Sequence, residues 1–513
     1  MENIGLPKEL SGVHIHFVGI KGTGMAALVE ILHNKGAVIT GSDVSERFYT
    51  DEILEKLGLK ALPFDSKNIT SKVQYVVYSS AYKLDKNPDL IEATKKNIPC
   101  ILYTQALGSY SSRAYSCGIC GVHGKTSTTG IVGTILKYID LPVQVLAGSV
   151  INSFGNTCTY TSPLIRDSKN SLENIFIAET CEYQRHFMSF CPKKIVLTSV
   201  EPDHQDFYPT YEDIRNAFVD YICLLPFGGD LIFCADDKGA LETANIAKQK
   251  RPDINLIPYG QNATGDFKLT FGKVESEKNN FSINFFEKES ENKSSQETSF
   301  ALSVPGKHEV LDACAAVALV CQLLKEKNLN SLNYYSAISK GLLAFSGGKR
   351  RSEVVGRAKN SFGDDILVID DYGHHPTAVK TTLAGYKEFY KGRKLIVDFM
   401  SHTYSRTQAL LTDFASCFDS ADEVILHKIY SSARENPKDF TITGKTLFEQ
   451  VLKNYPNGKK IVYYEDVLDA TDFVLSELKQ KKSEKYPDGY LFVTMGAGDN
   501  WKLGIEILKK MKK

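Results

Sequence analysis

Short apolar runs alternate with amphipathic stretches along most of the chain, which predicts an α/β fold. The first example is a strand-like run at residues 13–18, followed by a glycine-rich turn at 19–24 and a helical pattern that stops at Gly36. A second strand-like run at residues 38–40 then leads to Asp43. This is the order of a dinucleotide-binding unit: strand, glycine turn, helix, strand and acid. The turn therefore predicts a diphosphate site at a helix N-terminus.

The same alternation continues beyond this unit. Strand-like runs at residues 73–78 and 100–103 flank a helical stretch, and the first of them ends in Ser79 and Ser80. We therefore expect the first domain to close near Gly108. The polar run at residues 109–113 is predicted to be a linker.

A phosphate-binding loop is predicted where the next apolar run meets a helical pattern at residues 128–138. Its sequence is Cys120-Gly121-Val122-His123-Gly124-Lys125-Thr126-Ser127. Such a loop points backbone N–H groups at a phosphate and places a lysine and a hydroxyl beside it. The two glycines are closer together than in the full eight-residue pattern, so this is a shortened variant. It is the expected position of a nucleoside triphosphate.

Two later strand-like runs also end in residues that bear chemistry. The run at 175–178 is followed by Glu179, and the run at 194–198 is followed by His204 in the segment Glu-Pro-Asp-His. In a parallel sheet the carboxyl ends of strands share one edge, so these residues are expected to converge with Lys125 and Thr126. A carboxylate, a hydroxyl and an imidazole near phosphates predict a Mg²⁺ site. The alternative for His204 is a helix cap or surface histidine before a helix at 211–225.

A third α/β segment follows a polar stretch at residues 287–298, which is expected to be an exposed hairpin or loop, and a helix at 310–324. Strand-like runs at residues 366–369 and 395–399 end in segments rich in acids, histidines and arginine. Further runs at 423–426 and 489–494 complete a predicted small, doubly wound sheet. Ligands are expected at the carboxyl ends of its strands.

Composition narrows the class of protein. A chain of 513 residues exceeds what one hydrophobic core supports, so we expect three domains, at 1–108, 109–345 and 346–513. The formal net charge is zero, which argues against a nucleic-acid partner. The apolar runs are only strand-length and the first residues carry no signal-like pattern, so we expect a cytoplasmic protein with no membrane partner. Among the eleven cysteines, Cys117 and Cys120 form a CxxC that is read as plain strand rather than a redox or zinc site.

Several motifs in this order resemble the Mur ligase family over nearly the whole chain. They are HFVGIKGTGM, GVHGKTSTT, AETCEY, EPDH, PGKHEVLDACAA, GKRRSE, DDYGHHPTAV, SHTYSRT and GAGD. Among the members of the family, the chain is most similar to the ligases that join L-alanine to UDP-N-acetylmuramic acid.

The resemblance implies a three-domain fold: an N-terminal Rossmann-like domain for the UDP-sugar, a central P-loop ATPase domain with a parallel sheet, and a C-terminal Rossmann-like domain that closes over the site. It implies ATP-dependent amide formation between the lactyl carboxylate of UDP-N-acetylmuramic acid and the amine of L-alanine, with Mg²⁺. A monomer or weak homodimer is expected.

The resemblance also implies a role for particular residues. ATP would contact Gly121, His123, Gly124, Lys125, Thr126, Ser127, Arg351 and Asp371. The UDP-sugar would contact Gly19, Gly22, Thr23, Gly24, Met25, Asp43, Ser79 and Ser80. Metal ions would be held by Thr126, Glu179 and His204, and the amino acid by Tyr372, His402 and Arg406. The catalytic set would be Lys125, His204, His374, His402 and Arg406.

The chain departs from the family pattern at several positions. Glu179-Thr180-Cys181-Glu182-Tyr183 stands where many alanine-adding ligases have the acid-rich run EADES, of which the first and fourth positions survive. Glu309 and Asp312 stand where the adenine-side motif normally has asparagines, and Thr403 replaces an arginine often found after the histidine of SHTYSRT. Four alternatives stay open at this point: a ligase that attaches a preformed tripeptide to the same sugar nucleotide, a non-catalytic nucleotide-binding homologue, an NAD enzyme that uses the first glycine turn, and a first turn that binds no ligand.

Overall fold

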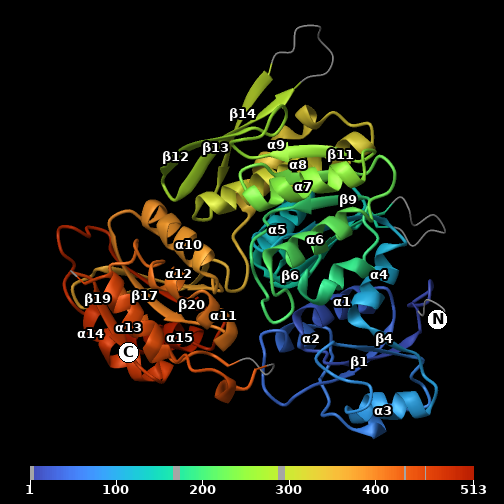
Figure 1. Cartoon of the computed structure of the whole chain (residues 1–513), viewed down its shortest axis with the longest axis horizontal. Coiled ribbons are helices and arrows are strands. Elements are labelled where there is room, and N and C mark those ends of the chain that lie inside the picture. Colours follow the sequence, from blue (N-terminus) through green and yellow to red (C-terminus); the bar gives the residue numbers. More distant parts are fainter. Residues whose placement is uncertain (1–4, 166–173, 287–294, 432–434, 457, 513) are drawn as a thin grey trace. The chain divides into compact units, whose positions relative to one another are not determined.

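The computed structural model describes residues 5–165, 174–286, 295–431, 435–456 and 458–512, and it contains two compact units (Figure 1). The first comprises Met1–Glu201, Glu212–Lys268 and Ala313–Ala344, and the second comprises Pro202–Tyr211, Leu269–Asp312 and Phe345–Lys513. Within the described ranges, every helix is too short or too polar to cross a lipid bilayer.

The first unit begins with a four-stranded parallel sheet in the order β2-β1-β3-β4. Its elements are β1 (His14–Val18), α1 (Thr23–Asn34), β2 (Val38–Ser42), α2 (Asp51–Lys56), β3 (Tyr75–Tyr78), α3 (Pro88–Lys95), β4 (Cys100–Leu102) and α4 (Tyr103–Ser111). The predicted succession of strand, glycine turn, helix and strand is confirmed, and the turn ends at the N-terminus of α1.

The polar run predicted as a linker is instead mostly helix. α4 continues to Ser111, and only residues 112–114 separate it from the next strand. Tyr110 is buried and donates a hydrogen bond to Gln144, while the buried Ser111 hydroxyl bonds to the Gly108 carbonyl oxygen. The prediction was wrong because these polar side chains find partners inside the protein and do not need solvent.

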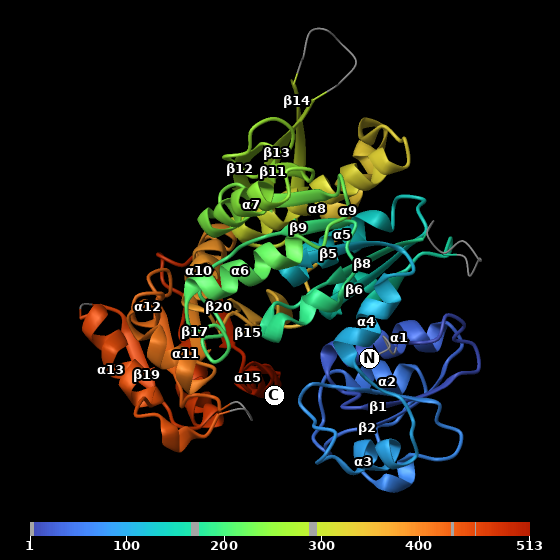
Figure 2. The same cartoon turned by 45° about the vertical axis from the view of Figure 1, so that its right-hand side comes forward.

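The first unit also contains a seven-stranded sheet in the order β11-β10-β9-β5-β8-β6-β7, parallel except for β7. Its strands are β5 (Tyr115–Cys120), β6 (Val143–Ile151), β7 (Thr157–Thr161), β8 (Ile175–Glu179), β9 (Lys194–Leu197), β10 (Asp230–Cys234) and β11 (Asn255–Tyr259). Its helices are α5 (Lys125–Leu136), η4 (Tyr183–Ser189, a 3₁₀ segment), α6 (Tyr211–Ile222), α7 (Lys238–Lys250), α8 (Lys307–Glu326, which crosses into the second unit) and α9 (Tyr335–Ala344). Helices α5 and α9 pack against each other and lie side by side in Figure 2.

Strand β5 is central to the site because it leads directly into the predicted phosphate loop and lies between β8 and β9. The three strands run in the same direction, so the residues that follow them share one edge of the sheet. Cys117 and Cys120 are free, buried thiols within β5, as the plain-strand interpretation predicted.

The second unit is built on a six-stranded sheet in the order β15-β16-β20-β17-β18-β19, with β15 as an antiparallel edge strand. Its strands are β15 (Glu353–Lys359), β16 (Asp365–Asp371), β17 (Arg393–Met400), β18 (Glu423–Leu426), β19 (Lys460–Tyr463) and β20 (Gly489–Gly496). Its helices are α10 (Pro376–Phe389), α11 (Tyr404–Ala409), α12 (Leu411–Ala415), α13 (Gly444–Asn454), α14 (Thr471–Leu478) and α15 (Trp501–Met511).

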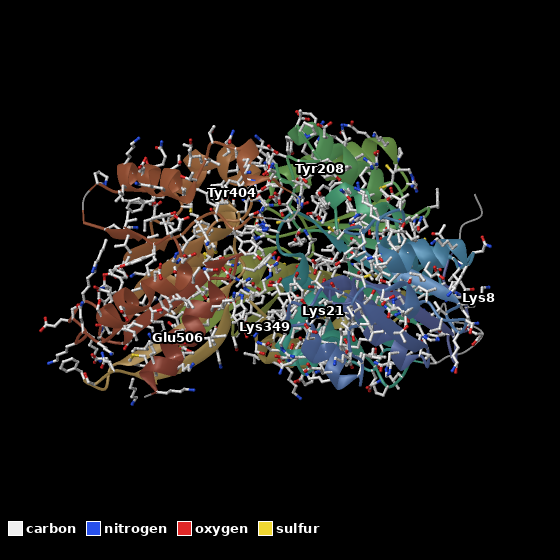
Figure 3. The ribbon with its side chains drawn as sticks, turned by 90° about the horizontal axis from the view of Figure 1, so that it is seen from below. Lys8, Lys21, Tyr208, Lys349, Tyr404 and Glu506 are labelled. Atoms are coloured by element: carbon white, nitrogen blue, oxygen red, sulfur yellow. The ribbon has the colours of Figure 1, made fainter. Side chains whose placement is uncertain are left out.

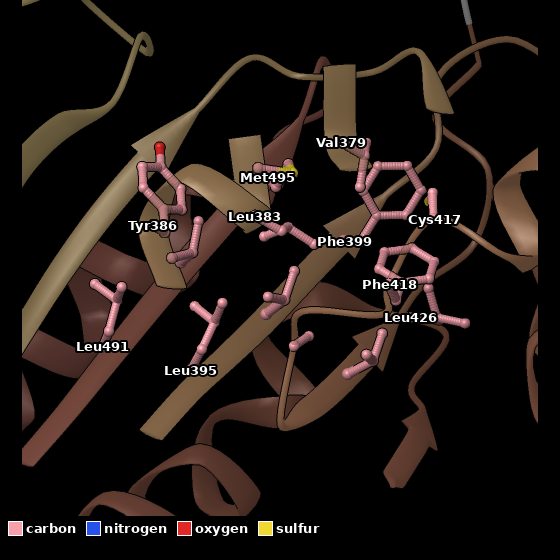
Figure 4. Packing of buried hydrophobic residues seen from close by; sticks show 14 of the residues in the cluster. Val379, Leu383, Tyr386, Leu395, Phe399, Cys417, Phe418, Leu426, Leu491 and Met495 are labelled. Carbon is pink, nitrogen blue, oxygen red and sulfur yellow. The ribbon is translucent and has the colours of Figure 1, made fainter. Parts of the chain in front are cut away.

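Helices cover both faces of this sheet. Residues of α10, α12 and α13, including Val379 and Leu383, pack on one face against Leu395 and Phe399 (Figure 4). Residues of α14 and α15 pack on the other face. The predicted doubly wound sheet is therefore confirmed, while the edge strands β15 and β19 had not been predicted.

A separate antiparallel sheet completes the second unit. It consists of β12 (Leu269–Glu275), β13 (Lys278–Phe286) and β14 (Ser295–Leu302). The predicted exposed loop at 287–298 falls largely outside the described residues, but its end, 295–298, belongs to β14.

Candidate functional site

The loop after β5 has the backbone of a phosphate cradle. Gly121 and Gly124 have φ angles of 136° and 80°, which favour glycine. A Cβ on Gly121 would also overlap the Thr198 side chain at the end of β9. The His123 backbone N–H donates to the Ser199 hydroxyl at 2.9 Å, so β9 holds the loop in place.

Lys125 lies at the start of α5 and is paired inside the protein. Its ammonium is 3.0 Å from Oε2 of Glu182, whose side chain is only 2 % exposed, and it also donates to the carbonyl oxygen of Gly121. Burial opposes the charged form, but Glu182 and the neighbouring Cys181 and Glu179 outweigh it and raise the pKa of Lys125. The lysine is therefore a permanent cation at the phosphate loop.

Thr126 and Glu179 form the second contact of this loop. The Thr126 hydroxyl donates to Oε2 of Glu179 at 2.8 Å, and the Gly148 backbone N–H donates to the same oxygen at 2.7 Å. A Cβ on Gly148 would overlap the carboxylate, so glycine is required there. A hydroxyl and a carboxylate oxygen side by side are the hard oxygen donors that Mg²⁺ prefers.

A cavity of about 200 Å³ lies at the N-terminus of α1. Six of the predicted UDP-sugar residues line it: Gly22, Thr23, Gly24, Met25, Ser79 and Ser80. Four lining residues had not been predicted: Leu102, Tyr103, Thr104 and His186. A Cβ on Gly24 would lie 2.6 Å from the Tyr103 hydroxyl oxygen, so this glycine makes room for the tyrosine beside the cavity.

Two of the predicted UDP-sugar residues, Gly19 and Asp43, do not line this cavity. The Asp43 carboxylate accepts hydrogen bonds from the backbone N–H of Lys21 at 2.7 Å and from the Tyr82 hydroxyl at 3.1 Å, so it fixes the glycine turn. Lys21, labelled in Figure 3, stands where the dinucleotide fingerprint has its second glycine. It is buried and donates hydrogen bonds to the carbonyl oxygens of Val44 and Glu46.

In the second unit, Arg406 is paired with Asp203. The guanidinium donates to Oδ1 of Asp203 at 2.7 Å, and both side chains are only 8 % exposed. Burial disfavours the carboxylate, but Arg406 and His204 outweigh it, so the pKa of Asp203 lies well below its usual range. Asp203 precedes the predicted metal ligand His204, whose backbone is left-handed at φ 54°.

Three rings of the predicted amino-acid region lie together in the same unit. The Tyr372 and His374 rings are 4.9 Å apart, and the His374 and His402 rings are 6.0 Å apart. The Nδ1 of His374 lies 2.8 Å from the Tyr372 carbonyl oxygen. Because a carbonyl only accepts, this nitrogen carries the hydrogen and Nε2 is left as the basic atom. Burial and the Arg406 charge hold the pKa of His374 well below its usual range, so the ring is neutral.

The remaining predicted ATP residues of the second unit, Asp371 and Arg351, have internal partners. Asp371 accepts hydrogen bonds from the backbone N–H groups of Ser352 and Gly373, each at 2.8 Å. The Arg351 guanidinium lies 5.3 Å from the centre of the Tyr372 ring. Glu309 and Asp312, at the start of α8, are buried.

The structure thus brings Lys125, Thr126 and Glu179 together in the first unit, and His374, His402 and Arg406 together in the second. His204 lies in the second unit and Glu179 in the first, so their predicted convergence stays a prediction. Sequence reasoning missed Glu182, Asp203 and His186. The first two lie inside motifs that had been recognised, whereas His186 carried no signal of its own.

Sequence profiles of one family match three consecutive parts of the chain. The profile described as "Mur ligase family, catalytic domain" matches residues 14–115, "Mur ligase middle domain" matches 119–320 and "Mur ligase, glutamate ligase domain" matches 350–498. The chain belongs to the Mur ligase family. This Mur ligase is 45 % identical over 501 residues to the UDP-N-acetylmuramate--L-alanine ligase of Treponema pallidum (strain Nichols), and the match covers 97 % of each chain.

Solved structures of Mur ligases share the fold. The UDP-N-acetylmuramate-alanine ligase of Thermotoga maritima matches with a TM-score of 0.72 at 22 % identity, over 97 % of this chain and 99 % of that one. A murein peptide ligase from Psychrobacter arcticus matches with a TM-score of 0.65, also at 22 % identity, over 98 % and 99 % of the two chains. The fold is therefore common to ligases that add different groups, and it does not by itself identify the substrate.

Proposed function

We propose that this Mur ligase joins L-alanine to the lactyl carboxylate of UDP-N-acetylmuramic acid, with ATP converted to ADP and phosphate. The observation that carries the proposal is the phosphate loop, where a buried lysine cation and an adjoining hydroxyl and carboxylate oxygen meet at one edge of the sheet. The 45 % identity to an alanine-adding ligase over nearly the whole chain supports the choice of substrates.

The chemistry needs no protein nucleophile. The lactyl carboxylate attacks the γ-phosphorus of ATP, which releases ADP and leaves an acyl phosphate. The amine of L-alanine then attacks the acyl carbon, and phosphate leaves from the tetrahedral oxyanion. Alignment of the reactants and neutralisation of charge provide most of the rate enhancement in such a reaction.

Lys125 would neutralise the β- and γ-phosphates, since its charge is maintained by the acids around it. Thr126 and Glu179 would hold Mg²⁺, and His204 would hold a second ion. When bound, the metal supplies positive charge next to the phosphates.

The second unit would bind the amino acid and remove its proton. Arg406 has guanidinium N–H groups beyond those that bond to Asp203, and these would meet the carboxylate of L-alanine. The Nε2 of His374 would accept the ammonium proton, because its Nδ1 is engaged with the Tyr372 carbonyl oxygen and Nε2 is left as the basic atom of the ring.

We propose the domain division 1–108, 109–345 and 346–513 for these three tasks. The cavity at the N-terminus of α1 would take the UDP-sugar, with the helix N–H groups and the serine hydroxyls facing its phosphates. The test is to supply the purified protein with UDP-N-acetylmuramic acid, ATP, Mg²⁺ and L-alanine, and to measure phosphate and product. Formation of phosphate without an alanylated product would reject the proposal.

A further inference from the structure

The segment before Phe187 has a strained backbone. Gln184 and Arg185 have φ angles of 51° and 59°, so two consecutive residues other than glycine are left-handed inside η4. A residue other than glycine keeps this backbone only where the surroundings hold it. His186 follows them directly and lines the cavity at the N-terminus of α1.

The strained turn is held by contacts on both sides of His186, whose ring also lies edge-to-face against the Tyr183 ring with centroids 6.1 Å apart. Phe187 is 2 % exposed, and its ring stacks on that of Tyr221 with centroids 4.4 Å apart. Arg185 pairs with Asp220 of α6 at 2.8 Å, but both side chains are more than a third exposed, so this pair adds little to holding the turn. On the opposite side, a Cβ on Gly108 would overlap the Ser189 carbonyl, so α4 approaches the end of η4 closely. These anchors fix the backbone on both sides of the histidine, while its ring lines the cavity.

The polar part of the cavity lining suits an anion, and it lies beside the apolar side chains of Met25 and Leu102 and the Tyr103 ring. Its described lining contains hydroxyls of threonine and serine together with the first N–H groups of α1, and it includes no carboxylate. The first turn of α1 has no acidic residue either. Lys21, which lies within the glycine turn before α1, already donates hydrogen bonds to the carbonyl oxygens of Val44 and Glu46. Among the described lining residues, His186 alone has a side chain that can become cationic.

We propose that His186 donates a hydrogen bond to the diphosphate of the nucleotide sugar bound in this cavity. The inference rests on the proposed function and adds to it a substrate-binding residue from the β8–β9 connection of the seven-stranded sheet. The bound ligand then contacts both α1, which follows β1 of the four-stranded sheet, and η4, which lies between β8 and β9 of the seven-stranded sheet. The strained turn presents the imidazole, and the anchors on α4 and α6 keep it in position.

The test compares His186→Ala and His186→Gln with Arg185→Ala as the matched control, because Arg185 shares the turn but does not line the cavity. Dissociation constants are measured by calorimetry for UDP-N-acetylmuramic acid and for UDP-N-acetylglucosamine, which lacks the lactyl carboxylate. Uridine, which lacks phosphate, is measured as a competitive inhibitor. Michaelis constants for ATP and L-alanine are measured on the same proteins.

A hydrogen bond to a charged group corresponds to roughly a tenfold to hundredfold change in affinity, so His186→Ala should weaken both UDP-sugars by that factor. The inhibition constant of uridine and the KM for ATP should stay within about twofold of the wild-type values, because neither uridine nor ATP would contact His186. His186→Gln, which keeps an N–H donor, should recover part of the affinity, and Arg185→Ala should bind both sugars like the wild type.

Three results would overturn the inference: unchanged affinity of His186→Ala, an equal loss in Arg185→Ala, or a loss seen with UDP-N-acetylmuramic acid but not with UDP-N-acetylglucosamine. The last would assign the histidine to the lactyl carboxylate. A wild-type protein that binds neither UDP-sugar would instead reject the proposed function, so the two failures are distinguishable.

Discussion

Replacing Lys125 with methionine separates the structural and the catalytic parts of the phosphate loop. The ammonium lies 3.0 Å from the Glu182 carboxylate, and the two side chains are 14 % and 2 % exposed. At an effective dielectric constant of about 20, two unit charges at this distance attract each other by roughly 5–6 kcal/mol before desolvation is counted. Removing one member of such a buried pair costs about 3–5 kcal/mol, because the other charge remains in the interior.

The Lys125→Met protein should therefore unfold at a temperature on the order of 5–15 °C below the wild type, followed by calorimetry. Its ligase activity should fall by at least about 10²-fold, as expected when a preorganised charge is removed from a transition state. In the double variant Lys125→Met/Glu182→Gln the isolated charge is gone, so most of the unfolding temperature should return while the activity should not. Lys238→Met, at the exposed first residue of α7, should change stability by no more than about 0.5 kcal/mol.

A Lys125→Met protein that unfolds at the wild-type temperature would contradict this prediction, and so would a double variant that is no more stable than the single one. Either result would mean that the buried pair does not exist in solution. Full ligase activity in Lys125→Met would have a different meaning, since it would show that ATP is not bound at this loop.

Three further predictions concern other parts of the molecule. Gly24→Ala places a Cβ 2.6 Å from the Tyr103 hydroxyl oxygen and should weaken UDP-sugar binding at least tenfold in calorimetry, with little change in the KM for ATP. Thr126→Val removes one of the two oxygen donors at the proposed metal site, so the Mg²⁺ concentration for half-maximal activity should rise while Kd for the UDP-sugar stays constant. Burial opposes protonation of His427, but the Asp398 carboxylate at 2.5 Å outweighs burial and raises the pKa of His427 above its usual value of about 6.5. The stability that the charged pair adds is therefore complete below about pH 6.5 and is lost as the pH rises through the raised pKa. The gap in unfolding temperature between wild type and His427→Gln should therefore be widest below about pH 6.5 and narrow as the pH rises above it; a constant gap would contradict the charged pair.

The elements with strong local signals were predicted from the sequence. The strand, glycine turn and helix around α1 and the loop before α5 each combine apolar periodicity with glycines that the backbone requires, such as Gly121 at φ 136°. The meeting of Glu179 and Thr126 at one edge of the sheet was predicted because β5 and β8 run in the same direction. These predictions depended on local patterns and one general rule of parallel sheets.

The contacts that were missed depend on packing between distant segments. The polar run at 109–113 was predicted as a linker, because nothing local shows that Tyr110 would be buried against Gln144. The pair of Arg406 with Asp203 joins residues 203 positions apart in the sequence. The strained turn that carries His186 has no sequence signature, since residues other than glycine adopt that backbone only when tertiary contacts impose it.

The most direct test of the account is an end-point assay of the wild-type protein with UDP-N-acetylmuramic acid, ATP and Mg²⁺, offered either L-alanine or the tripeptide L-alanyl-γ-D-glutamyl-diaminopimelate. The account predicts equal amounts of ADP, phosphate and UDP-N-acetylmuramoyl-L-alanine with L-alanine, and no amide product with the tripeptide. Product formed only with the tripeptide would contradict it.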